Sequence, residues 1–297
     1  MVKLFLPTHG KCIGGWILAL AKSLGIRNPL KNLKLETGNY FYKGVPHHLL
    51  DVASPKRRFT VAQYQRKARV ALGQILRRGK LPIICGGTGL YIDALIYDKK
   101  FPAVPPNKKL RAKLEKLSTI RLFARIRDID PERAKTLEKN NEQNNRRRLV
   151  RSLEIIDAIG KVPNLEQTSA YDVIKIGIKL PPEELKENIK KRLEKRLKND
   201  AMIDEVKNLH KNGLSWKRLD ELGLEYRYVS RYLRGLISRE EMKESILKES
   251  WKYARRQMTW WRKHPVKPQS DNGASKDIIW ISDPKIAFSK LRGFLFP

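Results

Sequence analysis

The stretch 60–85 constrains the fold more than any other part of this chain. Thr60 and Gln63 have the spacing of a capping box, apolar residues then recur with a helical period, and Gly79 supplies a helix stop. The apolar run 81–85 follows at once. Because a helix that leads directly into a short buried strand is typical of a parallel α/β sheet, we predict that fold class.

A glycine-rich turn, Gly86-Gly87-Thr88-Gly89, follows this strand and precedes a second helical pattern. Glycines let the backbone approach a bound group closely, and the free amide groups at a helix start favour anions. The pattern therefore indicates a binding turn. The plainer alternative is an ordinary connection between a strand and a helix.

The charge balance indicates a polyanionic partner. The chain has 63 Lys and Arg against 31 Asp and Glu, a formal net charge of +32. Nucleic acid is the usual partner for such an excess, and a solvated basic surface is the alternative. With only Cys12 and Cys85, a disulfide framework or a zinc site is not expected. No apolar run approaches the ~20 residues that span a bilayer, so we expect no membrane segment and a cytoplasmic location.

Several further elements follow from local patterns. Basic side chains of the helix that begins at Pro182, among them Arg192 and Arg196, are interpreted as a solvated face. The other predicted elements are a strand over 2–6, a loop over 38–51, helices over 107–117 and 131–160, strands over 174–180 and 277–281, and a helix capped by Ser238 and Glu241.

Two weak motifs precede residue 52. The segment Pro7-Thr8-His9-Gly10-Lys11-Cys12 has the Gly-Lys pair of a phosphate loop, but it lacks the first glycine and has Cys12 where a hydroxyl belongs. His47 and His48 suggest a metal site. Since no further His or Cys lies at ligand spacing, we expect buried, hydrogen-bonded histidines instead.

Two basic segments follow further along the chain. In the first, Arg147 and Arg151 lie one helical turn apart and suit a bidentate clamp on a phosphate, the alternative being an exposed cluster that only aids solubility. In the second, residues 253–261 interleave basic and aromatic side chains, which suits RNA contacts as well as an amphipathic helix with an aromatic core face.

Taken in order, these pieces resemble the tRNA dimethylallyltransferase (tRNA isopentenyltransferase) family over residues 33–264. Seven matches at suitable distances are more specific than any one of them. The matching segments are 44–51 (GVPHHLLD), 59–64 (FTVAQY), 86–91 (GGTGLY), 147–154 (RRLVRSLE), 202–206 (MIDEV), 222–227 (LGLEYR) and 256–260 (RQMTW).

The resemblance implies a P-loop NTPase-like α/β core with a parallel sheet and a helical insertion that grips the anticodon stem-loop of tRNA. The implied domains are 1–101 (first part of the core), 102–172 (insertion) and 173–297 (return to the core with C-terminal helices). The implied reaction moves a dimethylallyl group from dimethylallyl diphosphate to the exocyclic amine of the adenosine 3′ of the anticodon, with Mg²⁺ as cofactor. That adenosine is flipped into a channel, and we expect a monomer.

The resemblance also implies residue roles. Diphosphate would bind Thr8, Gly10, Lys11 and Cys12. The tRNA would contact Thr88, Arg111, Arg147, Arg148, Arg151, Arg255, Arg256 and Gln257.

One part of the family pattern is absent. Relatives carry an Asp-Ser-x-Gln-Val-Tyr segment whose aspartate is the proposed base, and it is not found near position 37. The catalytic base is therefore unassigned. Two alternatives stay open, a catalytically impaired tRNA-binding relative and a P-loop small-molecule kinase, although a kinase should have a complete phosphate loop.

Overall fold

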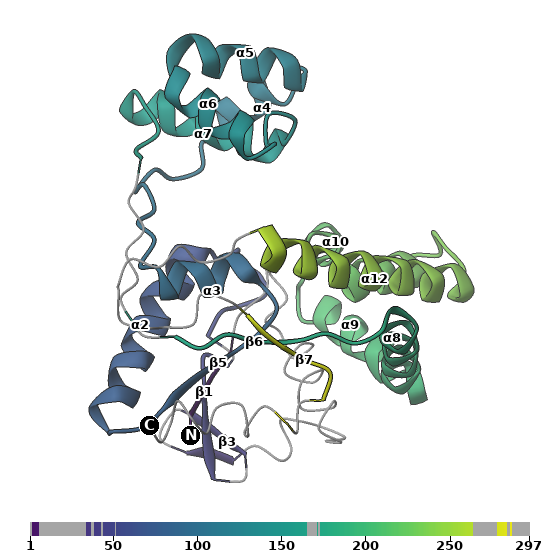
Figure 1. The fold of residues 1–297 in the computed structure, drawn as a ribbon. Coiled ribbons are helices and arrows are strands. Elements are labelled where there is room, and N and C mark those ends of the chain that lie inside the picture. The colour runs from purple at the N-terminus through teal and green to yellow at the C-terminus, as the bar shows by residue number, and fades with distance from the viewer. Residues whose placement is uncertain are drawn as a thin grey trace. The chain divides into compact units, whose positions relative to one another are not determined.

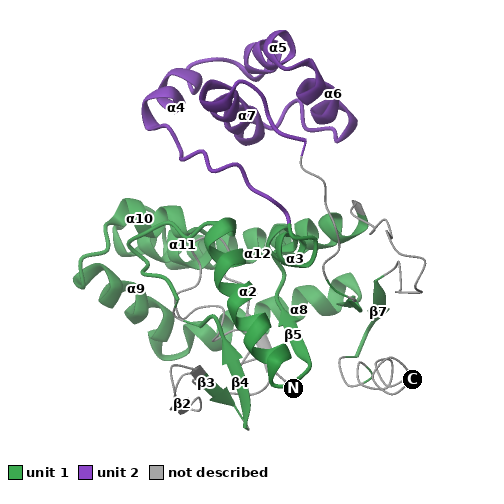
Figure 2. Ribbon diagram, turned by 90° about the vertical axis from the view of Figure 1, so that its left-hand side faces the viewer, with its two compact units in different colours: residues 1–98, 168–297 green, residues 99–167 purple. Residues whose placement is uncertain are grey.

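The computed structural model describes residues 2–5, 34–36, 39–42, 44–50, 52–164, 171, 173–263, 278–283 and 286 (Figure 1). The chain divides into two compact units (Figure 2). Unit 1 comprises 1–98 and 168–297, and unit 2 comprises 99–167. Within the described ranges, no helix is both long enough and apolar enough to cross a membrane.

The sheet of unit 1 is mixed. Its order is β2-β3-β4-β1-β5, and β1 runs parallel to both β4 and β5, whereas β2, β3 and β4 are joined antiparallel. The expected parallel pairing therefore holds for three strands and fails at one edge. The bounds are β1 Val2–Phe5, β2 Lys34–Glu36, β3 Asn39–Tyr42, β4 Val45–His48 and β5 Pro82–Cys85.

The predicted loop over 38–51 is wrong, because β3 and β4 form a hairpin there. Gly44 adopts φ +74°, which lets the chain reverse, and Tyr42 then pairs with Val45. The two histidines are buried as expected, at 6% and 4% exposed, and His47 Nδ1 lies 2.8 Å from the Val45 carbonyl. Burial lowers the pKa of His48, with a smaller contribution from the Arg78 charge, so its ring stays neutral near pH 7.

Helix α2 (Val61–Arg77) confirms the capping box. The Thr60 amide donates to Gln63 Oε1 at 2.8 Å, and the Gln63 amide donates to Thr60 Oγ1 at 3.2 Å. Gly79 has φ +63°, as a helix stop requires. The helix packs on α3 (Gly89–Ile96), where the Tyr64 and Tyr91 rings stack with centroids 5.0 Å apart.

The remainder of unit 1 is mainly helical and has a second core. The short strands β6 (Ile176–Ile178) and β7 (Ile279–Ile281) pair in parallel. The helices are α8 (Pro182–Leu197), the 3₁₀ turn η1 (Lys198–Asp200), α9 (Ala201–Lys211), α10 (Trp216–Leu222), α11 (Leu224–Leu233) and α12 (Arg239–Lys263). The starts predicted at Pro182 and after Ser238 are confirmed, and the Ser238 amide donates to Glu241 Oε2 at 2.7 Å.

Unit 2 is a bundle of four described helices around its own core. The helix predicted over 131–160 is in fact two, because Asn141 has φ +53° and Asn145 caps a new helix by accepting from the Arg148 amide. A further helix, which the sequence analysis did not predict, lies between the predicted helices over 107–117 and 131–160. The bounds are α4 Lys108–Leu114, α5 Thr119–Ile129, α6 Pro131–Lys139 and α7 Arg146–Ile159.

Candidate functional site

The glycine-rich turn leads from β5 into α3 and supplies the first component of the site. Thr88 is the N-cap of α3, yet its side chain makes no capping hydrogen bond. Its side chain lies close enough to the phenol of Tyr253, in α12, to lower the pKa of that phenol. The sequence places these two residues far apart, and the fold brings them together.

Helix α12 packs directly on the backbone of this turn. A Cβ at Gly87 would overlap the side-chain amide of Gln257, and a Cβ at Gly89 would overlap the indole ring of Trp260. Both glycines are therefore required by close packing of α12, whether or not they also approach a ligand. The predicted binding turn and the predicted basic-aromatic segment meet at this contact.

Tyr253 lies at the centre of the contact. Burial raises its pKa, and this effect outweighs the opposite influence of Thr88, Arg256, Gln257 and Arg192. The phenol therefore keeps its proton at physiological pH. The Arg256 guanidinium carbon lies 5.8 Å from the centroid of the Tyr253 ring, which is cation–π range.

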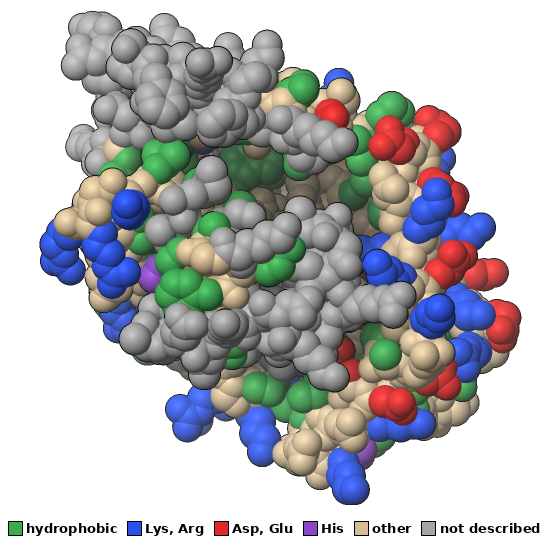
Figure 3. Space-filling view, turned by 90° about the horizontal axis from the view of Figure 1, so that it is seen from below, with side chains coloured by type: hydrophobic (Ala, Val, Ile, Leu, Met, Phe, Trp, Pro, Cys, Tyr) green, Lys and Arg blue, Asp and Glu red, His purple; other side chains and the backbone are tan. Residues whose placement is uncertain are grey.

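Of the predicted arginines of α12, Arg256 lies beside Tyr253, on the side of the helix that faces the turn. Arg255 and Arg256 are both exposed, whereas Gln257 is half-buried against Gly87. Figure 3 shows one face of the molecule, on which Lys and Arg side chains lie along both edges and the Asp and Glu side chains gather mainly toward the right-hand side.

Two arginines of helix α8 form ion pairs with Glu225, which the interpretation of a solvated face did not include. Arg196 is only 3% exposed, and its Nη1 donates to Glu225 Oε1 at 3.0 Å, which Arg192 Nη2 also approaches at 3.3 Å. Burial lowers the pKa of Arg192, although the Glu225 charge opposes this. The interpretation of a solvated face is therefore wrong at Arg196. A signal was present, since Arg196 lies three residues after Leu193 and therefore on the same side of the helix as this apolar position.

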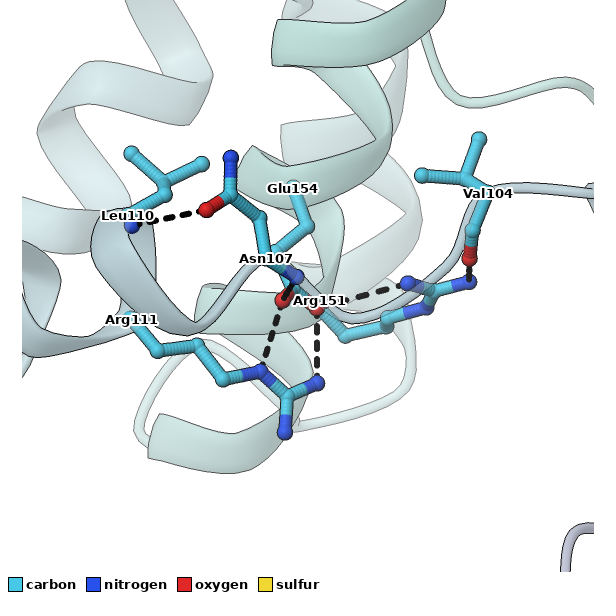
Figure 4. Close-up of polar contacts among 6 residues, drawn as sticks. All are labelled: Val104, Asn107, Leu110, Arg111, Arg151 and Glu154. Atoms are coloured by element: carbon cyan, nitrogen blue, oxygen red, sulfur yellow. Dashed lines mark hydrogen bonds and ion pairs between the residues drawn. The ribbon is translucent and has the colours of Figure 1, made fainter.

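In unit 2, Glu154 gathers two of the predicted arginines (Figure 4). Its carboxylate is fully buried and accepts from Arg111 Nε at 2.6 Å, from Arg111 Nη2 at 2.7 Å and from Arg151 Nη1 at 3.3 Å. The Asn107 amide donates to the same carboxylate at 2.8 Å, and Arg151 Nη2 donates to the Val104 carbonyl at 2.7 Å. Arg111 and Arg151 thus hold the chain at α4 and α7 together.

The electrostatics of Glu154 reflect this arrangement. Burial alone raises its pKa, but the hydrogen bonds from Arg111 and Asn107 outweigh burial, and the net pKa lies below the usual value. The carboxylate is therefore ionised at neutral pH, so both salt bridges have a charged acceptor there.

The other two predicted arginines of α7 differ from this pair. Arg148 Nε lies 2.9 Å from Glu142 Oε1. Arg147 is exposed, and no hydrogen bond or ion pair joins it to the part of the chain that the structure describes. The bidentate clamp expected from Arg147 and Arg151 is therefore not formed in advance, because Arg151 is held by Glu154.

Four predicted diphosphate ligands, Thr8, Gly10, Lys11 and Cys12, lie outside the described residues. The strand that precedes them is described, and Phe5 of β1 pairs with Cys85 of β5. The two parallel strands therefore end side by side, at the edge where the glycine-rich turn begins. Among described side chains, no group of three or more His, Cys, Asp or Glu is suited to hold a metal ion.

Comparisons with known proteins identify relatives of the whole chain. The family model described as IPP transferase matches residues 37–264. The tRNA dimethylallyltransferase 2 of Treponema denticola is 38% identical over 266 residues, covering 84% of this chain and 87% of that protein. The tRNA dimethylallyltransferase of Anoxybacillus flavithermus is 35% identical over 260 residues, covering 86% and 79%.

Solved structures are similar as well. The tRNA isopentenylpyrophosphate transferase of Bacillus halodurans has a TM-score of 0.56 and 27% identity, covering 99% of this chain and 94% of that chain. A eukaryotic dimethylallyltransferase acting on tRNA has a TM-score of 0.66 over 100% and 80%, and its 20% identity supports a likeness of fold alone. The extent of these matches establishes that the chain belongs to the IPP transferase family.

Proposed function

We propose that this protein transfers a dimethylallyl group from dimethylallyl diphosphate to the exocyclic amine of the adenosine 3′ of the anticodon in tRNA. The relatives from T. denticola and A. flavithermus are named for this class of reaction. The observation that carries the proposal is the contact between the Thr88 turn and α12, which brings together a hydroxyl that caps no helix, a protonated phenol and the exposed Arg256.

The reaction breaks the bond between the allylic carbon and the diphosphate oxygen and forms a bond from that carbon to the amine nitrogen. Diphosphate leaves with the electron pair of the broken bond, and the alkylated amine then passes a proton to water. Because ionisation gives an allylic cation, the protein mainly has to neutralise diphosphate and position the amine. Thr88 offers a hydroxyl that orients the target base, the buried Tyr253 phenol lies behind it, and Arg255 and Arg256 offer charge to RNA phosphates.

The diphosphate is assigned to Thr8, Gly10, Lys11 and Cys12 as part of a P-loop NTPase-like core. The support is the pairing of Phe5 with Cys85, because the segment after β1 then leaves the sheet at the edge where the Thr88 turn starts. Carboxyl ends of parallel strands are the usual ligand edge of such sheets. Mg²⁺ bound to the diphosphate would neutralise the leaving group.

Unit 2 is proposed to bind the anticodon stem-loop. Arg147 is the residue best placed for a phosphate contact, since it is exposed and unengaged by the described residues. Arg111 and Arg151 act differently, because Glu154 occupies much of their hydrogen-bonding capacity. We assign these two arginines an indirect role, in which they keep α4 and α7 in register behind the RNA-binding surface.

The test is to incubate the purified chain with unmodified tRNA, Mg²⁺ and dimethylallyl diphosphate and to search nucleoside digests for prenylated adenosine by mass spectrometry. Binding of tRNA without product would indicate the impaired relative. Phosphate transfer from ATP to a small acceptor, without tRNA affinity, would indicate the kinase.

A pair of variants adds site information to this test. Thr88→Val removes the hydroxyl without removing a helix cap and should lower kcat/KM about tenfold or more. Thr136→Val is the matched control, since its hydroxyl donates only to the Glu132 carbonyl on exposed α6. Equal activity of the two variants would remove Thr88 from the site.

A further inference from the structure

Asp93 is a buried carboxylate that the reaction as proposed does not use. It lies in α3, one turn after Gly89, and is only 2% exposed. Its Oδ2 accepts a hydrogen bond from Trp260 Nε1 at 3.0 Å, across 167 residues of sequence. Asp93 therefore connects the helix that begins at the Thr88 turn to the helix that covers this turn.

The partner of Asp93 belongs to a stripe on α12. Tyr253, Gln257 and Trp260 follow one another at spacings of four and three residues, so they share one face of the helix. Gln257 and Trp260 fill the space beside Gly87 and Gly89. Because the three side chains share a face, any rotation of α12 that displaces Trp260 displaces the Tyr253 phenol from Thr88.

A second polar connection supports the same helix pair. Lys175 Nζ donates to the Tyr97 hydroxyl at 2.5 Å and lies 5.8 Å from the centroid of the Trp261 ring. Burial raises the pKa of Tyr97, and the nearby Asp93 charge raises it further, so this phenol also stays protonated. The segment that precedes β6 is thus attached to the end of α3 and to α12.

The close packing of Gln257 and Trp260 on the two glycines restricts α12, but apolar contact has little directionality. A hydrogen bond to a buried carboxylate does have direction, and buried polar groups can fix register where an apolar pair would not. We propose that Asp93 is a positioning residue, which sets the rotation of α12 through Trp260 and so aims Tyr253 and Gln257 at Thr88. This inference rests on the proposed function of the Thr88 turn.

Two substitutions at Asp93 separate position from mere stability. Asp93→Asn keeps an acceptor oxygen for the indole, so kcat should stay within about threefold of the parent chain. Asp93→Leu keeps the volume but removes the acceptor, and kcat should fall roughly 10- to 100-fold, with KM for dimethylallyl diphosphate changed less than about threefold, since small misplacements cost this much. Leu219→Ala is the control for lost stability, because the core around Leu219 includes α12 only through its first half, at Met242 and Ile246, more than three turns before Trp260.

The assay measures transfer kinetics well below the melting temperature of each variant, together with ¹⁹F NMR of chain labelled with 5-fluorotryptophan. Trp260→Phe identifies the Trp260 resonance, which should move in Asp93→Leu and stay in Asp93→Asn. The inference is overturned if Asp93→Leu retains its kcat, if both Asp93 variants lose kcat alike, or if Leu219→Ala with equal loss of melting temperature loses as much.

Failure of the proposed function has a different signature. If the parent chain makes no prenylated adenosine, the proposed function is wrong. The NMR experiment alone then tests whether Asp93 sets the position of α12. A Trp260 resonance that moves only in Asp93→Leu supports the positioning role in that case, and an unmoved resonance in both variants overturns it.

Discussion

Replacing Glu154 by glutamine should destabilise unit 2 while leaving unit 1 unchanged. The carboxylate is fully buried and accepts from two guanidinium groups and one backbone amide, and glutamine has one acceptor oxygen and no charge for these partners. Removing one member of a buried pair costs ~3–5 kcal/mol. Because Arg111 and Arg151 are 33% and 34% exposed, the released cations reach water, so we expect roughly 2–3 kcal/mol, near the value for hydrogen bonds to charged groups.

Hydrogen exchange read by mass spectrometry is the suitable assay for Glu154→Gln. The six tryptophans of the chain all lie outside 99–167, so tryptophan fluorescence follows unit 1 alone. Peptides from α4 and α7 should exchange about 30- to 150-fold faster at amides that open with the unit, since ~1.4 kcal/mol is a factor of ten. The fluorescence transition should not move.

The control for this experiment is Glu138→Gln, on exposed α6 of the same unit. A surface substitution of this kind should stay within ~0.5 kcal/mol. Unchanged exchange in Glu154→Gln, or equal changes in both variants, would refute the reasoning that the buried carboxylate holds α4 on α7.

Three more outcomes follow from the same contacts. Folding lowers the pKa of Glu154, so its contribution to the stability of unit 2 is fully present above the pKa of the unfolded chain and is lost as the pH falls through the pKa of the folded chain. The hydrogen-exchange protection of unit 2 should therefore fall less steeply between about pH 5 and 3 in Glu154→Gln than in the parent chain. Arg147→Ala should weaken tRNA binding and make the slope of log K against log salt shallower by ~0.7–0.9, and an unchanged slope would contradict a phosphate contact. Gly89→Ala forces a methyl group against Trp260 and should cost about 1–3 kcal/mol, measured as a lower melting temperature by tryptophan fluorescence.

Local signals in the sequence were sufficient for the elements that are capped locally. Thr60 with Gln63 and Ser238 with Glu241 complete their hydrogen bonds within one turn, so their spacing alone predicts the helix starts. The hairpin at 39–48 was missed because its turn residue, Gly44, lies within a segment whose Pro46 and paired histidines are typical of a loop. The register of a hairpin depends on pairing, which composition does not reveal.

The site was predictable in its parts and not in its contacts. Thr88 and Gln257 were both identifiable from their segments, but nothing local indicates that Gln257 packs on Gly87. Arg111 and Arg151 are residues of the type that binds RNA, and the sequence gives no sign that both bind Glu154 instead. Glu154 lies 43 residues from Arg111 along the chain. The burial of a carboxylate cannot be predicted from a single sequence, because it depends on residues that only the fold brings near it.

The span of the Asp93–Trp260 hydrogen bond has a consequence for synthesis on the ribosome. The core of unit 2 is made from residues 114–156 and needs no later part of the chain, so it is able to form early. The turn at Thr88 is made before unit 2, yet its cover arrives only with α12. A nascent chain halted before Trp260 would therefore have unit 2 folded while the Thr88 turn still lacks the side chains of α12 that cover it.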